Sequence, residues 1–266
     1  MKILLLLLLQ MLLFGLLSNC SSVKENQIWS ESPTFIKETP PSDYVDQLDL
    51  LSRLFLSDSG QEEIKLKKES NDYLNKIVKR LSTSSENIFK NKFSIEIHII
   101  KSKNNFIFSL PRGSLFISSN VLLKYLKSEE LLVSTIACEM LRIKKNIYHK
   151  SEMIPVGYLS LQNLARINKL NQDEKIILNE WVYYILKRAG FDSTNYLNWI
   201  QIMAKNYSDF SLMVDNEISL LKEEFEFKTF LAKHGVLITE FKQSEANNTS
   251  SQFYKIIAEV NKQANK

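Results

Sequence analysis

The chain has few of the residues that build covalent cross-links and metal sites. Its 266 residues include two cysteines, Cys20 and Cys138, and three histidines. Cys20 closes an N-terminal run that is typical of a lipoprotein signal, so Cys138 is expected to be the one other thiol of the mature chain. No disulfide can then form within the mature chain, and the fold must depend on its hydrophobic core.

The chain also lacks any long block of like charges. Its 34 basic and 30 acidic residues give a formal net charge of +4, spread along the sequence. Nucleic-acid binding depends on basic residues that cluster on one face, so we expect no nucleic-acid partner. The excess positive charge leaves open a weak attraction to anionic lipid.

An apolar N-terminus is present instead. After Met1 and Lys2, residues 3–17 are almost wholly Leu, Ile, Met and Phe, and residues 17–20 read L-S-N-C. This run is shorter than the ~20 apolar residues that a membrane-spanning helix needs. We therefore predict a lipoprotein signal peptide at 1–19 and a lipidated Cys20, with an ordinary cleaved or uncleaved signal as the alternative.

The predicted anchor sets the expected location. A lipidated Cys20 makes the membrane a partner and places the protein in a bacterial cell envelope. Ser21 follows it, and by resemblance to other bacterial lipoproteins this favours the outer membrane over the inner one. Residues 20–43 are polar and contain three prolines, so we expect a flexible lipidated tether. Residues 44–266 are expected to form the domain.

Most of the domain has helical patterning. Ser128, followed by two glutamates, is a favourable helix start, because the hydroxyl can cap free amides and acids favour the positive end of the helix dipole. Asn171 with Glu174 resembles a capping box, and Gly190 is a helix stop. Further helical segments are predicted at 44–56, 61–81, 171–188, 193–205, 211–233 and 252–261.

Three short segments have strand patterning. In residues 93–100, apolar and polar residues alternate and many side chains are β-branched. Segments 106–110 and 114–118 are joined by Pro111-Arg112-Gly113, where proline fixes φ and glycine can take a positive φ. We therefore expect an α+β fold that is mainly helical, with a small three-stranded sheet.

One region of the chain is similar to a known catalytic core. Residues 108–113 read F-S-L-P-R-G, a short strand follows to Ser118, and residues 136–142 read I-A-C-E-M-L-R on a helix. This order resembles the HtpX-like gluzincins, peptidase family M 48, which have A-F-x-L-P-G-G, a second strand, the turn G-L-L and a helix with A-H-E-x-x-H. Residues 188–193, R-A-G-F-D-S, resemble the family's R-A-G-Y-D-P. The resemblance covers 61–205 and implies a gluzincin-like domain with the sheet beside the former active-site helix.

The residues that bind zinc in that family are replaced here. Two imidazoles four residues apart on one helix face, with a carboxylate from a second helix, hold the metal. Cys138 and Arg142 stand at the two histidine positions, and Glu139 remains at the general-base position. Cys138 could ligate as a thiolate, whereas Arg142 keeps its proton and repels a dication. The resemblance therefore implies former metal-ligand positions without a metal or other cofactor.

The third ligand position also fails in this comparison. Counting back without gaps from Arg188 places Ile177 at the ligand glutamate and Asn179 at a following aspartate. Isoleucine cannot bind zinc. A slip of one helical turn would bring in Glu174 or Glu180, so an unconventional ligand set is kept as an alternative.

The three histidines do not rebuild a metal site. His98 lies in a predicted strand, His234 lies near a helix end, and His149 is roughly 16 Å beyond Cys138 along a helix axis, at ~1.5 Å per residue. Cys138 as a nucleophile would need a nearby base, and none stands at helical spacing. We expect structural or surface roles for all four residues.

Two features are expected to survive the loss of zinc. Glu139, which is buried in the family, needs a cation or a proton, and Arg142 three residues later can pair with it. The second feature is a peptide-binding edge strand, on which the family's substrates add a strand by main-chain pairing. Its residues are Phe106, Ile107, Phe108, Ser109 and Leu110. The strand could also be retained for folding alone.

These expectations combine into one function. We expect a membrane-tethered bacterial lipoprotein whose zinc-peptidase-like domain is catalytically inactive and binds extended or unfolded envelope proteins. One alternative is an active zinc metalloendopeptidase with an unconventional ligand set, and another is a structural or surface-adhesion lipoprotein. The metal content of the purified protein separates the second hypothesis from the other two, and its binding partners separate the first from the third.

Overall fold

The structure is a computed structural model that describes residues 42–57, 60–90, 93–148, 159–236 and 249–265. The predicted signal peptide, Cys20 and His149 lie outside these residues, as does all but the end of the predicted tether. Within the part of the chain that is described, no helix is long and apolar enough to cross a membrane.

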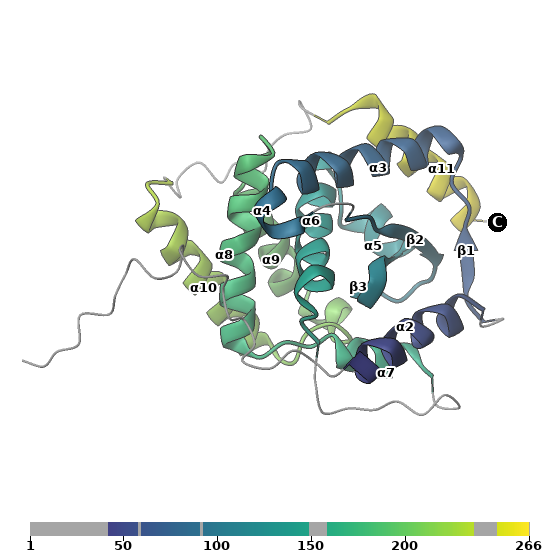
Figure 1. Cartoon of the computed structure of the whole chain (residues 1–266), viewed down its shortest axis with the longest axis horizontal. Helices are drawn as coiled ribbons and strands as arrows, with labels where there is room; N and C mark the ends of the chain where they lie inside the picture. The colour runs from purple at the N-terminus through teal and green to yellow at the C-terminus, as the bar shows by residue number, and fades with distance from the viewer. Residues whose placement is uncertain (1–41, 58–59, 91–92, 149–158, 237–248, 266) are drawn as a thin grey trace, which may run out of the picture. The chain divides into compact units, whose positions relative to one another are not determined.

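Helices make up most of the described residues (Figure 1). Short 3-10 turns are η1 (Pro111–Gly113) and η3 (Tyr207–Phe210). The α-helices are α2 (Ser42–Ser57), α3 (Lys68–Thr83), α4 (Glu86–Phe89), α5 (Ser119–Lys124), α6 (Glu129–Lys145), α7 (Leu161–Ile167), α8 (Gln172–Arg188), α9 (Asn195–Lys205), α10 (Glu217–Lys233) and α11 (Ser251–Ala264). With one small sheet, they confirm the mainly helical α+β fold.

The sheet has four strands in the described residues, not the three expected from the sequence. These strands are β1 (Glu62–Ile64), β2 (Glu96–Lys101), β3 (Ile107–Leu110) and β4 (Ser114–Ser118), in the order β1-β2-β4-β3. β2 and β4 are parallel, and the other neighbours are antiparallel. β1 lies in a segment predicted as helix, because pairing of Ile64 with Ile99 outweighs the local helical patterning. β3 is therefore an edge strand.

The corner between β3 and β4 has the predicted turn chemistry. Gly113 takes φ 111°, and a β-carbon there would lie 2.8 Å from the carbonyl oxygen of Ser94, so no larger residue fits without a shift. Arg112 also has a positive φ, 65°, which the sequence did not indicate. Its guanidinium pairs with Asp46 of α2, and this contact joins the corner to the first described helix.

One face of the sheet packs against α2 through an aromatic cluster. The cluster comprises Phe55 of α2, Phe106 and Phe108 around β3, and Phe116 of β4, with neighbouring ring centroids 5.1 to 6.5 Å apart. The rings meet edge-on or tilted, which aromatic quadrupoles favour. Because successive side chains of a strand point to opposite faces, Ser109 beside Phe108 faces the other way, toward α6.

Helix α6 is surrounded by the rest of the domain. Every residue from Leu131 to Ile143 is buried, and α8 and α9 pack along the helix while α10 packs against those two (Figure 1). Ser128 caps its first turn as predicted, accepting from the amide of Leu131. At α8, Asn171 and Glu174 form the predicted capping box. Local signals therefore place the two helices that matter most for the site.

Some segments differ from the sequence-based expectation. Three short helices, α4, α5 and α7, were not predicted, because each is too short for a periodic pattern to show. The helix predicted at 211–233 begins at Glu217 instead. Asn216 accepts a hydrogen bond from the amide of Ser219 and so starts α10 there, which leaves 211–216 as a connection after η3.

Candidate functional site

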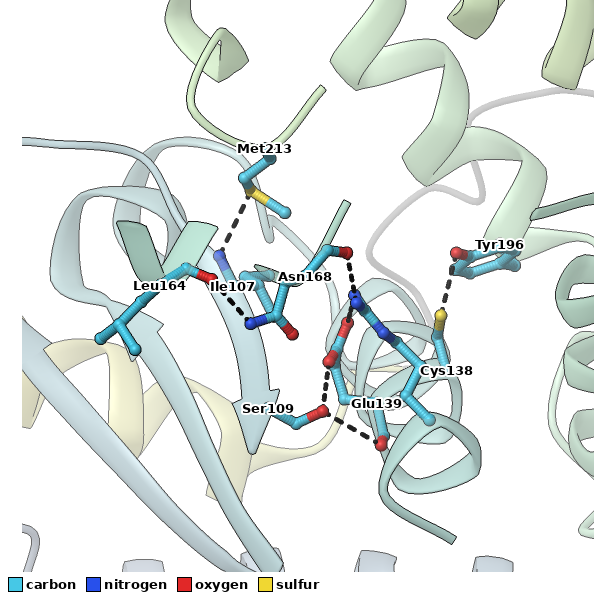
Figure 2. Close-up of polar contacts among 9 residues, drawn as sticks. Ile107, Ser109, Cys138, Glu139, Leu164, Asn168, Tyr196 and Met213 are labelled. Carbon is cyan, nitrogen blue, oxygen red and sulfur yellow. Dashed lines mark hydrogen bonds and ion pairs between the residues drawn. The ribbon is translucent and has the colours of Figure 1, made fainter. Parts of the chain in front are cut away.

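Glu139 lies at the centre of a buried polar contact between α6 and the sheet. Its Oε2 accepts a hydrogen bond of 2.7 Å from Ser109 Oγ of β3 (Figure 2). Its Oε1 lies 3.3 Å from a guanidinium nitrogen of Arg142. Both members of the ion pair are buried. The predicted contact between Glu139 and Arg142 is confirmed, and it faces the sheet.

The guanidinium of Arg142 has a second anchor. It donates to the backbone carbonyl of Asn168, which follows α7, while its Nε has no hydrogen-bond partner among the described residues. Burial lowers the pKa of Arg142, but the charge of Glu139 more than offsets this effect and the net pKa is raised. A fixed positive charge therefore stands one helical turn beyond Cys138.

Cys138 is held as a neutral thiol. Its Sγ lies 3.1 Å from the hydroxyl of Tyr196 on α9, and both side chains are buried (Figure 2). Burial, together with the charge of Glu139, raises the pKa of the thiol far above its ordinary value. Burial also raises the pKa of Tyr196. Because the thiolate is the nucleophile and the metal ligand, Cys138 is poorly suited to either role.

These side chains border a cavity of about 70 Å³. Helices α6, α8, α9 and α10 contribute most of its walls, and β3, the connection between α7 and α8 and the connection after η3 complete them. Its polar lining residues are Thr135, Cys138, Glu139, Arg142, Asn168, Lys175, Asn179, Tyr196 and Glu223. The apolar lining residues are Ile107, Leu170, Leu178, Trp199, Met203, Met213, Val214 and Leu220.

Glu223 is a site residue that the sequence reasoning missed. It lies on α10, is buried, and accepts a hydrogen bond of 2.9 Å from the side-chain amide of Asn179. Burial raises the pKa of Glu223, although the charge of Lys175 and the bond from Asn179 oppose this effect. A signal was present, because Glu223 falls at helical spacing between the buried Leu220 and Phe227.

The structure brings together only some of the predicted ligand positions. Cys138, Glu139, Arg142 and Asn179 all line the cavity, whereas Ile177 does not. On α8 the residues that line the cavity are Lys175, Leu178 and Asn179. The count without gaps from Arg188 chose Ile177 as the ligand position, and Ile177 lies on a neighbouring face of that helix. Of the two glutamates considered for a shifted count, Glu174 is used by the capping box and neither lines the cavity.

The histidines that the structure describes serve other contacts. His98 of β2 lies 2.7 Å from a carboxylate oxygen of Glu63 on β1, and His234 lies 2.7 Å from the hydroxyl of Tyr184. In the described ranges, no three His, Cys, Asp or Glu side chains converge to hold a metal ion. A neutral thiol, a guanidinium and an already bonded carboxylate do not fit the donor set that zinc requires.

The outer edge of β3 borders the same cavity. The amide of Ser118 donates to the carbonyl of Phe106, so Phe106, Phe108 and Leu110 bond to β4 while Ile107 and Ser109 direct their backbone groups away from it. The outward amide of Ile107 donates to the thioether of Met213, 3.3 Å away (Figure 2). The sequence did not indicate this contact, because Met213 comes from the distant connection before α10.

Comparisons with known proteins add no assignment. No protein-family model matches the chain, and no curated protein matches it. The resemblance to the gluzincins, and every residue role that it implies, remains a prediction from motif order.

Proposed function

We propose that this domain binds an extended polypeptide by strand addition at the outer edge of β3 and does not hydrolyse it. The observation that carries the proposal is the outward amide of Ile107 on the edge strand β3, whose hydrogen-bond acceptor among the described residues is only a thioether. In keeping with the predicted lipid anchor at Cys20, the partners are extended or unfolded proteins of a bacterial envelope, and the tether holds the domain at the membrane.

The edge of β3 has unused capacity for main-chain pairing. A thioether sulfur is a weak acceptor, and a peptide carbonyl in its place forms a stronger bond with the amide of Ile107. Strand addition needs a regular row of outward groups, which Ile107 and Ser109 supply two residues apart. A peptide that pairs with this edge therefore has to displace the side chain of Met213, but it does not have to break any hydrogen bond between strands of the sheet.

The contacts of Glu139 argue against hydrolysis. A general base needs a free carboxylate oxygen directed at a water, and Glu139 uses one oxygen with Ser109 and the other with Arg142. Arg142 also places a permanent positive charge where a dication would have to sit. We infer that the guanidinium supplies in part the charge that zinc supplies in an active gluzincin.

Binding is tested with the purified full chain in detergent micelles. The probe is a labelled soluble peptide of alternating Thr, Val and Lys, with a copy N-methylated on alternate residues as the ligand control. Ile107→Pro removes the outward amide and no bond to β4, so it should weaken binding at least about tenfold, whereas Ile107→Val should not. Equal affinity for both peptides and both variants would refute strand addition.

Catalytic inactivity and anchoring have separate tests. The peptide should be recovered intact, by mass spectrometry, after long incubation with added zinc, and chelator-sensitive cleavage would favour the active endopeptidase. Cys20→Ala should abolish lipid processing and release the chain from the membrane fraction, because two or three acyl chains anchor stably. Unchanged processing and membrane retention of that variant would contradict the lipoprotein prediction.

An exposed apolar stripe on α10 supports the adhesion hypothesis as a second candidate. Ile218, Leu221 and Phe225 lie on one side of the helix and are 78%, 52% and 66% exposed. Exposed apolar residues that adjoin one another often mark contact surfaces. Changing all three to serine should leave peptide binding at β3 intact, and loss of adhesion to envelope fractions in this variant alone would favour the second candidate.

A further inference from the structure

The cavity beside β3 has the position and size of a side-chain pocket. Ile107 and Met213, which meet at the outer edge of β3, also line the cavity. A chain added at this edge directs alternate side chains to the α6 side of the sheet. One water molecule, which has one non-hydrogen atom, needs about 10–15 Å³ of cavity volume. The cavity of about 70 Å³ therefore holds roughly five non-hydrogen atoms.

Three polar atoms of the lining residues lack hydrogen bonds. The side-chain oxygens of Asn168 and Asn179 and the Nε of Arg142 are buried and have no partner among the described residues. All three residues are more than nine-tenths buried. A buried polar group that is left unpaired is destabilising, so this arrangement favours an occupant that offers two donors and one acceptor.

The charges around the cavity select a neutral occupant. Glu139 and Arg142 neutralise each other across 3.3 Å. A cation entering the cavity meets the fixed charge of Arg142 and the ammonium of Lys175, whereas an anion meets the carboxyl groups of Glu139 and Glu223. Isolated charges are costly at such a depth, so a neutral polar group is favoured over either ion.

We propose that the cavity is a pocket for a neutral carboxamide, the side chain of an asparagine or glutamine in the bound chain. Its NH₂ group supplies two donors for the oxygens of Asn168 and Asn179, and its carbonyl accepts from Nε of Arg142. Leu178, Trp199 and Leu220 provide apolar walls for the methylene groups. Delivery of this side chain by a peptide rests on the proposed strand addition, whereas the chemistry of the pocket does not.

The pocket is tested first without any peptide. The full chain is labelled at its methionine methyl groups and titrated with propionamide, propionate or propylammonium. Propionamide should shift the methyl signals of Met203 and Met213, which line the cavity, and not that of Met140, which is buried elsewhere on α6. The two ions should bind at least about tenfold more weakly. No saturable shift, or an equal response to all three probes, would overturn the inference.

Peptides then test delivery of the side chain. Matched peptides carry Gln, Glu or Met at one position of the Thr, Val and Lys sequence, placed in two registers. The Gln peptide should bind at least about tenfold more tightly than the others in one register. Ile107→Pro should weaken all of them alike, while Asn179→Leu combined with Glu223→Met should remove only the preference for Gln.

The two experiments separate the two possible failures. If propionamide binds but no peptide does, the pocket stands and strand addition is wrong. If peptides bind at β3 without preference for Gln, strand addition stands and the carboxamide pocket is wrong. If the double variant does not fold, as judged by circular dichroism, the ligand series on the wild-type chain decides the matter alone.

Discussion

The two faces of the sheet hold β3 in contrasting ways. On the α2 face, Phe106 and Phe108 pack into the aromatic cluster, where the rings make apolar contacts with one another. On the α6 face, Ser109 bonds to Glu139, which in turn pairs with Arg142. Buried ion pairs are often no more stabilising than apolar residues of the same size. The α6 face therefore has a cost that the α2 face avoids, and this difference directs attention to the α6 face for function.

The largest expected loss of stability comes from the aromatic cluster. Phe116 is fully buried, with ring centroids 5.2 Å from Phe55 and 5.1 Å from Phe108. Phe116→Ala should lower the free energy of unfolding by about 3–5 kcal/mol, because it leaves a cavity among rigid rings. Phe116→Leu is the control and should cost less. Denaturant melts measure both, and a cost under about 1 kcal/mol for the alanine variant would contradict the stated role of the cluster.

The α6 face should respond to charge balance instead of volume. Arg142→Met leaves Glu139 buried without its cation, and should lower the free energy of unfolding by roughly 3 kcal/mol. Adding Glu139→Gln to that variant should recover part of the loss, although more side-chain polarity has been removed. Additive effects across the two single variants and the double variant would show that the side chains do not interact.

The comparison of faces also shows what could be predicted from sequence. Helix starts at Ser128 and Asn171 and the turn at Gly113 rest on hydrogen bonds or φ values within a few residues, so the sequence alone predicted them. Contact between Glu139 and Arg142 was predictable for the same reason, since the two lie three residues apart on one helix.

Features that depend on distant segments were not predicted. β1 exists because Ile64 pairs with Ile99, and the edge of β3 is covered because Met213 arrives from a connection more than a hundred positions away. Likewise, Asn179 faces the cavity and Ile177 does not, which depends on how α8 is rotated against α6. The burial of Glu223 was predictable, because this residue lies at helical spacing between buried apolar residues of α10. Its hydrogen bond with Asn179 was not predictable, because Asn179 lies on another helix.

Substitution of Glu223 is expected to have a smaller effect, which raises the free energy of unfolding, whereas the substitutions of Phe116 and Arg142 lower it. Burial raises the pKa of this carboxyl, so its folded form holds the proton more tightly than its unfolded form. The stability that results is fully present below the unfolded pKa and is lost as pH rises through the folded pKa. Glu223→Gln stays neutral, so it should match the wild type at acidic pH and exceed it by about 1 kcal/mol at alkaline pH.

Denaturant melts across the pH range measure that difference, with Glu224→Gln as the control. Glu224 is the neighbouring residue on α10, and its pKa is lowered, because its bonds to Lys228 and Gln201 outweigh the opposing effect of burial. That substitution should therefore reduce stability at neutral pH and lose its effect as pH falls through the folded pKa. A stability difference for Glu223→Gln that does not change with pH would show that folding does not raise the pKa of Glu223.

The smallest expected effect concerns Met213, which covers the outer edge of β3 between the two faces of the sheet. Its thioether accepts from the amide of Ile107, and a peptide must displace it before strand addition. Met213→Ala removes this competitor and should raise peptide affinity about fivefold, or about 1 kcal/mol, because less of the chain must first be opened. Titration of the labelled Thr, Val and Lys peptide into the full chain measures the change.

Met213→Leu separates the two ways in which Met213 can compete. Leucine keeps most of the bulk but has no sulfur acceptor, so it should leave affinity near the wild-type value if steric cover is the barrier, and near that of Met213→Ala if the hydrogen bond is the barrier. Because Met213 is only partly buried, neither variant should lower the free energy of unfolding by more than about 1 kcal/mol. Lower affinity in both variants would mean that Met213 contacts the bound peptide, and that the edge of β3 is completed by this side chain instead of being blocked by it.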